Sequence, residues 1–437
     1  MQKEVKPKPT YAIVAAVQLP SVTDLEFEAS LTELRELAKT LGYEVVKTFI
    51  QKRTGFDMRA YLGAGKRQEI RDYVNESAEE IVALLVDHEI SPSQARNLEL
   101  EVGCEVMDRT MVILEIFHRN ARSRAARAQV EIARLGYMAP RLREAAKLAG
   151  PQGRQRSGEG GRGAGESQTE LDRRKIRDRI AELQLEIVAM DAERKTQRAR
   201  RQERKGLAAV ALVGYTNAGK STLMRALTGS EVLVANKLFA TLDTTVRALY
   251  PESVPRVLVS DTVGFIKNLP HGLVASFKST LDEALDASLL LHVVDASDPG
   301  FERQLEVTDD VLKEIGADVI TRLLVFNKVD HVGDSAMQNE REISLKAKYP
   351  GCVVMSARRP EDVAKLHQQI VEFFQQDLVE TELFLPWSAQ QFRGDIYANC
   401  QVLNERSDDD GTFFMVRSEA DVIQKIREQL GLSTAIE

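Results

Sequence analysis

The sequence predicts an α/β protein in which a doubly wound sheet carries a P-loop. A small α/β domain with a long two-helix hairpin precedes this sheet, and a small α+β domain follows it. Three observations support the prediction: a glycine loop after an apolar run, alternating strand and helix patterns, and two helical seams around a glycine-rich stretch. The expected boundaries are 1–120, 121–205, 206–377 and 378–437.

The first part shows the alternation of a parallel sheet. Apolar runs at 12–17, 44–49 and 81–86 are separated by amphipathic stretches such as 31–41, which is the pattern of βαβ units. The glycines of 63–66 precede a lysine, but the segment lacks the spacer and the following Ser/Thr of a phosphate loop. We favour a turn that caps a helix there, with a separate ATP site in this domain as the alternative.

The second part concentrates the positive charge of the chain. The net charge is −7, yet residues 121–206 hold 22 Lys and Arg against 12 Asp and Glu, a net of +10 that leaves −17 elsewhere. Segment 150–168 contains seven glycines, which favours a mobile tip over a helix. Steps of three and four on either side predict an antiparallel helix pair with the seam Ala125, Ala128, Ile132, Leu135, Ile176, Ile180, Leu183, Ile187 and Met190.

Arginine outnumbers acidic residues near the expected tip. Arginine makes bidentate contacts with phosphate and stacks on bases, and a flexible basic segment can order itself on an irregular RNA surface. An ordinary solvated helix face is the alternative, because charged faces usually bind nothing. The candidate RNA-binding residues are Arg141, Arg143, Arg154, Arg156 and Arg162.

The third part begins with the phosphate loop. An apolar run, 207–213, predicts a buried strand, and the segment after Ser221 predicts a helix. Glycines at both ends of the loop let its N–H groups converge on phosphate oxygens, Lys220 reaches the β- and γ-phosphates, and the Ser221 hydroxyl ligates Mg²⁺. The loop comprises Gly214, Tyr215, Thr216, Asn217, Ala218, Gly219, Lys220, Ser221 and Thr222.

Two later segments predict guanine as the base. After an apolar run, the Asp330 carboxylate can accept from both N–H donors on the edge of guanine, a pair that adenine lacks. Asn327 would brace the loop, and the Lys328 stem would pack on the base. After the next strand, a backbone N–H can reach guanine O6. The predicted base-binding residues are Asn327, Lys328, Val329, Asp330, Ser356, Ala357 and Arg358.

Residues between these segments predict the γ-phosphate and metal contacts. Asp261 ends a strand and would hold Mg²⁺ through water, while the Gly264 N–H would meet the γ-phosphate, with Thr262 and Val263 between them. An upstream threonine should ligate Mg²⁺ when the γ-phosphate is present. Thr241 is favoured and Thr245 is the other candidate, and the surrounding predicted contacts are Phe239, Ala240, Thr241, Leu242 and Asp243.

The residue after Gly264 predicts how hydrolysis proceeds. Many GTPases place a glutamine there to orient the attacking water, whereas this chain has Phe265, whose ring cannot hydrogen-bond water. We therefore expect slow hydrolysis in isolation, with Lys220 and Gly264 as catalytic groups and a partner surface supplying the rest. Related GTPases with an asparagine at the matching P-loop position can hold K⁺ against the phosphates, and this resemblance makes Asn217 a candidate K⁺ ligand; bracing of the loop is its alternative role.

The motifs together resemble one family. Gly-Tyr-Thr-Asn-Ala-Gly-Lys-Ser-Thr, Phe-Ala-Thr-Leu-Asp-Thr-Thr, Asp-Thr-Val-Gly-Phe-Ile and Leu-His-Val-Val-Asp-Ala-Ser occur in the order found in the HflX family, a branch of the Obg-like GTPases. Tyr-Leu-Gly-Ala-Gly-Lys at 61–66 and the arginine-rich segment after Met107 are also similar to that family. The resemblance implies ribosome-associated GTP hydrolysis, including separation of ribosomal subunits in stalled or stressed translation, with the large subunit and its RNA as partner.

The last part and the composition complete the expectations. We predict a helix at 389–399, strands at 400–403 and 412–416 around an Asp-rich turn, and a final helix at 419–430. Three widely spaced cysteines indicate neither disulfides nor a zinc site, and no apolar run approaches membrane-spanning length, so we expect a cytoplasmic monomer. The competing function is a signalling switch whose hairpin docks a protein rather than RNA.

Overall fold

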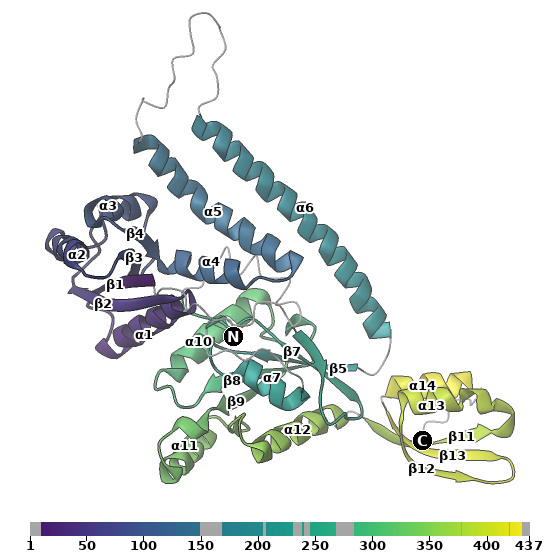
Figure 1. The fold of residues 1–437 in the computed structure, drawn as a ribbon. Coiled ribbons are helices and arrows are strands. Elements are labelled where there is room, and N and C mark those ends of the chain that lie inside the picture. The colour runs from purple at the N-terminus through teal and green to yellow at the C-terminus, as the bar shows by residue number, and fades with distance from the viewer. Residues whose placement is uncertain are drawn as a thin grey trace, which may run out of the picture.

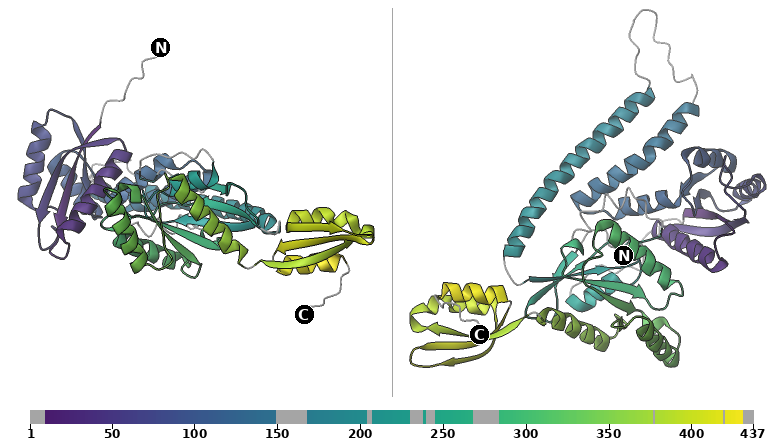
Figure 2. Two further views of the ribbon diagram at one scale, coloured as in Figure 1. Left: turned by 90° about the horizontal axis from the view of Figure 1, so that it is seen from below. Right: turned by 180° about the vertical axis from the view of Figure 1, so that it is seen from behind.

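The computed structural model describes residues 10–148, 168–203, 207–229, 238–239, 245–267, 284–376, 378–418 and 420–430. The described residues form three sheets, and two long helices project from the body beside the first sheet (Figure 1). The first and last domains lie on opposite sides of the central one in both further views (Figure 2). This arrangement confirms the predicted fold class.

The N-terminal domain is a four-stranded parallel sheet in the order β2-β1-β3-β4. Gly63 is the N-cap residue of α2, and its N–H donates to Gln51 Oε1 at 2.9 Å, so the glycine segment is a helix-capping turn. The elements are β1 (Thr10–Gln18), α1 (Asp24–Thr40), β2 (Tyr43–Lys52), α2 (Ala64–Glu76), β3 (Ile81–Val86), α3 (Pro92–Val102), β4 (Glu105–Asp108) and α4 (Arg109–Asn120).

Helix α1 shows why these residues fold locally. Thr23 and Glu26 form a capping box at its start, and Leu31, Leu34 and Leu37 recur on one face and are fully buried against the sheet. Burial of each leucine contributes roughly 1.5–3 kcal/mol relative to exposure. This helix also faces the central domain, a position that matters for the nucleotide site.

Helices α5 (Arg124–Leu148) and α6 (Gln168–Glu203) run side by side as the predicted hairpin (Figure 1). The predicted seam residues are buried or half-buried, while most of their neighbours on α6 are exposed. Pro140 lies inside α5. The tip-proximal part of α5 is fixed to the first domain, because Asp108 of β4 pairs with Arg141 of α5 at 2.8 Å.

The central domain is a six-stranded sheet in the order β10-β9-β8-β5-β7-β6, with only β6 antiparallel. His292 of β8 is buried, and burial lowers its pKa to about 3, so it is a neutral core residue. The elements are β5 (Leu207–Val213), α7 (Lys220–Thr228), β6 (Thr245–Ala248), β7 (Arg256–Asp261), β8 (Leu289–Asp295), α10 (Phe301–Ile315), β9 (Arg322–Asn327), η2 (Val329–His331), α11 (Ser335–Lys348), β10 (Val353–Val354) and α12 (Pro360–Gln375).

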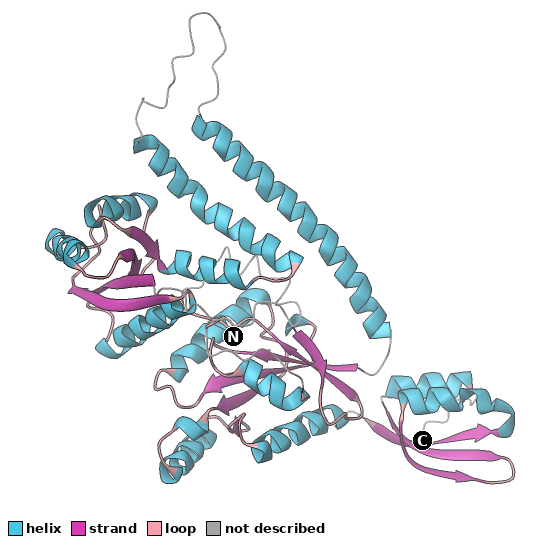
Figure 3. Ribbon diagram, viewed as in Figure 1, coloured by secondary structure: helices cyan, strands magenta, loops and turns pink. Residues whose placement is uncertain are grey.

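The C-terminal domain is a three-stranded antiparallel sheet, β11-β13-β12, with helices on one face (Figure 3). Strand β11 was not predicted from the sequence. The expected helix at 389–399 is α-helical only from Arg393, and the residues before it form a 3-10 helix with non-helical angles at Ala389. Asp408 caps the β12–β13 turn through its carboxylate. The elements are β11 (Val379–Pro386), η3 (Trp387–Phe392), α13 (Arg393–Asn399), β12 (Gln401–Ser407), β13 (Gly411–Ser418) and α14 (Ala420–Gln429).

Candidate nucleotide-binding site

The loop between β5 and α7 has the tight backbone that the sequence predicts. Gly214, Asn217 and Gly219 have φ values of 140°, 60° and 96°. A Cβ on Gly214 would lie 2.2 Å from the Val293 carbonyl oxygen, and one on Gly219 would lie 2.3 Å from Asn327 Nδ2. Only glycine fits at these two positions, because both the dihedral angle and the space exclude a side chain. Tyr215, Thr216 and Ala218 lie on the same loop, and Thr222 on the first turn of α7.

Lys220 is buried inside this loop. Its Nζ donates to the carbonyl oxygens of Gly214, at 3.0 Å, and Tyr215, at 2.9 Å. Burial lowers the Lys220 pKa to about 8, and Asp261 opposes this by favouring the ammonium. The loop therefore holds a cation among converging backbone groups, which is the arrangement that binds phosphate oxygens.

Ser221 and Asp261 supply hard oxygen donors beside the loop. The Ser221 hydroxyl donates to Asp261 Oδ2 at 2.7 Å, and Asp261 is fully buried at the end of β7. Thr262, the next residue, is buried and donates to the Leu212 carbonyl at 2.7 Å, which fixes the strand end. A hydroxyl and a carboxylate in contact fit Mg²⁺, which prefers oxygen ligands and keeps several waters.

The segment before β6 is only partly described. Phe239 has φ 56°, and its N–H donates to Thr216 Oγ1 of the P-loop at 3.3 Å. Thr245 begins β6 opposite Asp261. The remaining predicted contacts, Ala240, Thr241, Leu242 and Asp243, lie outside the described residues.

Asn327 joins the two loops that the sequence assigned to phosphate and base. Its Nδ2 donates to the Ala218 carbonyl at 3.0 Å, and its Oδ1 accepts from the Ala357 N–H at 2.9 Å. Lys328 has φ 62°, and its Nζ contacts Asp295 Oδ2 at 2.8 Å. Asp295 was not among the predicted site residues, although it follows the apolar run of strand β8 and belongs to the Leu-His-Val-Val-Asp-Ala-Ser motif.

Asp330 lies on η2, directly after Val329, and leaves 22% of its side chain exposed. Its Oδ2 is 3.5 Å from His331 Nε2 and 3.9 Å from Arg358 Nη1. Ser356 supports the facing loop, since its N–H donates to Asp362 and its Oγ accepts from the Arg358 N–H. The two segments that the sequence predicts to contact the base therefore lie together at the carboxyl ends of β9 and β10.

Phe265 packs into the domain core and is only 2% exposed. Its N–H donates to the Gly214 carbonyl at 3.1 Å, and its carbonyl accepts from the Thr216 N–H at 2.6 Å. A Cβ on Gly264 would lie 2.8 Å from Thr216 Cα and 3.0 Å from Lys220 Nζ, so the glycine lies against the P-loop, with buried Val263 before it. The ring is thus unavailable to orient water, as the sequence indicated.

The hairpin arginines differ in their surroundings. Arg124 pairs loosely with Glu186 of α6, at 3.5 Å, and keeps 78% of its side chain exposed. Arg141 instead contacts Asp108 and Tyr137 and is 14% exposed, so its guanidinium is paired inside the protein and holds the tip-proximal part of α5 to the N-terminal domain. The Arg143 side chain and Arg154, Arg156 and Arg162 lie outside the described residues.

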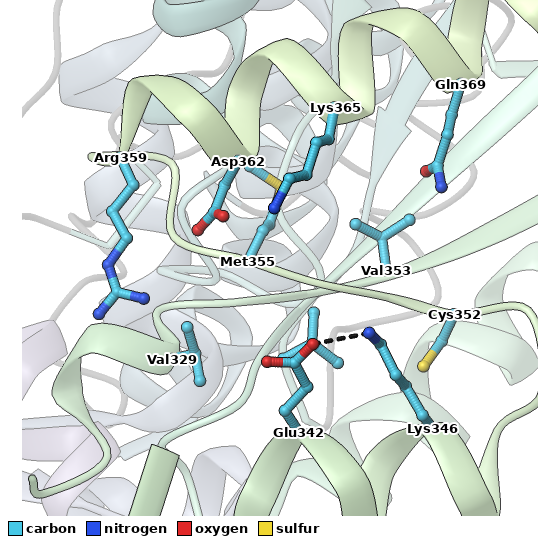
Figure 4. Close-up of a pocket in the computed structure, with 11 residues that line it drawn as sticks. Val329, Glu342, Lys346, Cys352, Val353, Met355, Arg359, Asp362, Lys365 and Gln369 are labelled. Atoms are coloured by element: carbon cyan, nitrogen blue, oxygen red, sulfur yellow. Dashed lines mark hydrogen bonds and ion pairs between the residues drawn. The ribbon is translucent and has the colours of Figure 1, made fainter. Parts of the chain in front are cut away.

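A separate pocket of about 180 Å³ lies between α11, α12 and β10 (Figure 4). Its polar lining includes Glu342 and Lys346, which pair at 2.6 Å, together with Arg359 and Lys365. Val329 and Met355 form part of its wall, but no P-loop residue does. The pocket therefore does not include the phosphate loop, although through Val329 it adjoins the segment predicted to contact the base.

Three family models match the chain in the order of its domains. A model described as GTP-binding GTPase N-terminal matches residues 28–118, one described as GTP-binding GTPase middle region matches 120–201, and one described as 50S ribosome-binding GTPase matches 209–328. Together with the loop geometry, the last match defines the class: the chain is a P-loop GTPase, an enzyme that binds and hydrolyses GTP.

Similarity to known GTPases covers nearly the whole chain. GTPase HflX of Gluconacetobacter diazotrophicus is 50% identical over 98% of this chain and 99% of its own. GTPase HflX of Escherichia coli is 37% identical over 92% of this chain and 91% of its own. The chain belongs to the HflX GTPase family.

Similarity to a solved structure is lower than similarity to these HflX proteins. A GTP-binding protein from the archaeon Sulfolobus solfataricus, in complex with GDP, is 24% identical over 82% of this chain and 99% of its own. The TM-score is 0.44, too low to inform the site. Within the described ranges, none of the helices combines the length and the apolar character that a membrane span requires.

Proposed function

We propose that this GTPase binds the ribosome, chiefly the RNA of its large subunit, through the α5–α6 hairpin, and that it separates the subunits of stalled or stressed ribosomes in the cytoplasm. The observation that carries the proposal is the net charge of +10 within residues 121–206 of an otherwise acidic chain. That charge belongs to a projecting hairpin (Figure 2), which suits it to reach into an RNA surface. The description of the matching central family model agrees with this partner.

For the nucleotide, the proposed roles follow the geometry of the loops. Lys220 and the P-loop N–H groups bind the phosphates, Asp330 accepts from the guanine edge, and Asn327 holds the two loops at a fixed separation. Mg²⁺, when bound, offsets charge that develops on the phosphates. Ser221 and Asp261 would hold it, with Thr241 as a further ligand and K⁺ beside Asn217 as a second cation.

Catalysis is proposed to need a partner. Phe265 packs in the core and offers no hydrogen bond to water, so the position after Gly264 supplies no group that orients the nucleophile. The Gly264 N–H would bind the γ-phosphate, and the ribosome would place the missing group. The proposal therefore links the site in the central domain to the surface presented by the hairpin.

Sedimentation with purified ribosomal subunits tests the partner. With a non-hydrolysable GTP analogue, the protein should pellet with the large subunit, and added salt should release it because phosphate contacts displace counterions. With GDP, the pelleted fraction should fall. Protein that stays in the supernatant under all conditions would favour the alternative, a switch that binds a protein partner.

A further inference from the structure

The side chain of Tyr215 leaves the nucleotide loop and enters the contact with the N-terminal domain. Its hydroxyl accepts from the Lys267 N–H at 2.8 Å and donates to Glu33 Oε2 at 2.7 Å. Lys267 follows Gly264 by three residues, so this hydroxyl connects the segment after Asp-Thr-Val-Gly to helix α1. Tyr215 is only 7% exposed, and water therefore does not replace these bonds readily.

Glu33 is itself held by a buried charge cluster at the carboxyl end of the N-terminal sheet. Arg109, 2% exposed, binds Glu33 with one guanidinium nitrogen and Asp87 with another, the latter at 3.1 Å. Ser30 of α1 donates to the second oxygen of Asp87 at 2.7 Å. Burial raises the pKa of Asp87 to about 6 and lowers that of Arg109 to about 10, so both remain charged at neutral pH.

The position of this cluster is informative. In open parallel sheets, ligands bind beyond the carboxyl ends of the strands, where the strand order reverses. In the order β2-β1-β3-β4 that point lies between β1 and β3, and Asp87 directly follows β3. The Glu33 carboxylate held by this cluster binds a residue of the P-loop, which places the central domain where such a sheet usually takes a small ligand.

Apolar contacts support the polar ones. Tyr215, Phe239, Val263 and Ile266 of the central domain belong to the same buried cluster as α1 and α4. The rings of Phe117 and Phe239 pack edge to face at 4.6 Å between centroids, and Asn120 Nδ2 donates to the Phe239 carbonyl at 2.8 Å. The interface that contains the Tyr215 hydroxyl thus combines apolar packing with polar contacts.

We propose that Tyr215 is a positioning residue for GTP hydrolysis, whose hydroxyl ties the segment that carries Gly264 to Glu33 of the N-terminal domain. The segment then has two anchors: the backbone bonds of Phe265 to the P-loop and the bond from the Lys267 N–H to Tyr215. Removing the bond from the Lys267 N–H to the Tyr215 hydroxyl should let the Gly264 N–H move, while the backbone groups that bind phosphate keep their positions. The inference rests on the proposed role of Gly264 at the γ-phosphate.

The test is steady-state GTP hydrolysis and fluorescent GDP binding by the full-length chain. Tyr215→Phe should lower kcat by about fivefold or more, the lower end of typical couplings between sites. KM and GDP affinity should stay within about twofold, because the backbone N–H groups and Lys220 remain in place. Glu33→Ala should lower kcat similarly, and the double variant should be no slower than the slower single variant.

Tyr43→Phe is the matched control. It removes a tyrosine hydroxyl at the edge of the same cluster, 3.8 Å from Met107 Sδ, and should leave kcat unchanged. An unchanged kcat in folded Tyr215→Phe, or an equal loss in Tyr43→Phe, would overturn the inference. So would a parallel loss of kcat and GDP affinity. A parent protein that neither binds GDP nor hydrolyses GTP would instead refute the proposed function.

Discussion

The central domain and the hairpin differ in how deeply their positively charged side chains are buried. Lys220 is buried and held by two carbonyl oxygens, whereas Arg124 of the hairpin keeps 78% of its side chain in solvent. A buried cation has one fixed set of partners and suits one ligand, while exposed cations suit an extended, irregular anion such as folded RNA. Arg141 shows that the distinction follows burial and not the helix, because it belongs to α5 yet is paired inside the protein.

The largest expected effect is a loss of stability, and it compares a buried arginine with an exposed one on the same helix, α5. Arg141→Ala leaves the buried Asp108 carboxylate without its cation, and breaking such a pair costs about 3–5 kcal/mol of unfolding free energy. Arg124→Ala, the control on the same helix, should leave the free energy of unfolding nearly unchanged. Chemical denaturation measures both. Equal stability of the two variants would mean that Arg141 behaves as a surface charge.

The second largest expected effect is a change in which base the protein binds when Asp330 is substituted. Asp330→Asn replaces an acceptor by a group that also donates, so GTP binding should weaken by roughly 1.5–3 kcal/mol. Binding of xanthosine triphosphate should improve, because xanthine offers an acceptor where guanine offers a donor. Asp334→Asn, at the N-cap of α11, is the control and should not change base preference. Unaltered GTP affinity in Asp330→Asn would remove this residue from the base site.

The tip of the hairpin should show a smaller, salt-dependent effect. Changing Arg154, Arg156 and Arg162 to Ala should weaken ribosome binding and lower the salt slope by roughly 0.7 per lost phosphate contact. Intrinsic GTP hydrolysis should remain close to that of the parent. The charge-matched control changes the exposed Arg225, Arg247 and Arg256 of the central domain. If the control loses as much binding, the charge of the whole protein and not the tip mediates it.

The smallest expected effect is the uptake of a proton by Lys220 when nucleotide binds. The pKa of Lys220 is about 8 without nucleotide, and phosphate oxygens should raise it toward its ordinary value of 10.5. At pH 8.5 the empty site is mostly deprotonated, so GDP binding should take up about half a proton or more, and almost none at pH 7. Calorimetry in buffers of different ionisation enthalpy measures this. Equal uptake at both pH values would place the Lys220 pKa outside this window.

The sequence was informative where function depends on neighbouring residues. The P-loop, Asn327 and Asp330 each follow an apolar strand, and parallel strands bring their carboxyl ends to one edge. The contact of Tyr215 with Glu33 joins residues 182 positions apart, and no local pattern signals it. The pairing of Arg141 was missed for the same reason, because an arginine on a basic helix has the same sequence signal whether buried or exposed.

The central claim is that the site around Phe265 is completed by the ribosome. Turnover of GTP should be compared in K⁺ and in Na⁺, each with and without large ribosomal subunits, at constant Mg²⁺. We expect slow hydrolysis by the free protein, a modest gain in K⁺ from a cation beside Asn217, and a much larger gain with the large subunit. Equal rates in all four conditions would contradict both the cation-assisted and the partner-completed site.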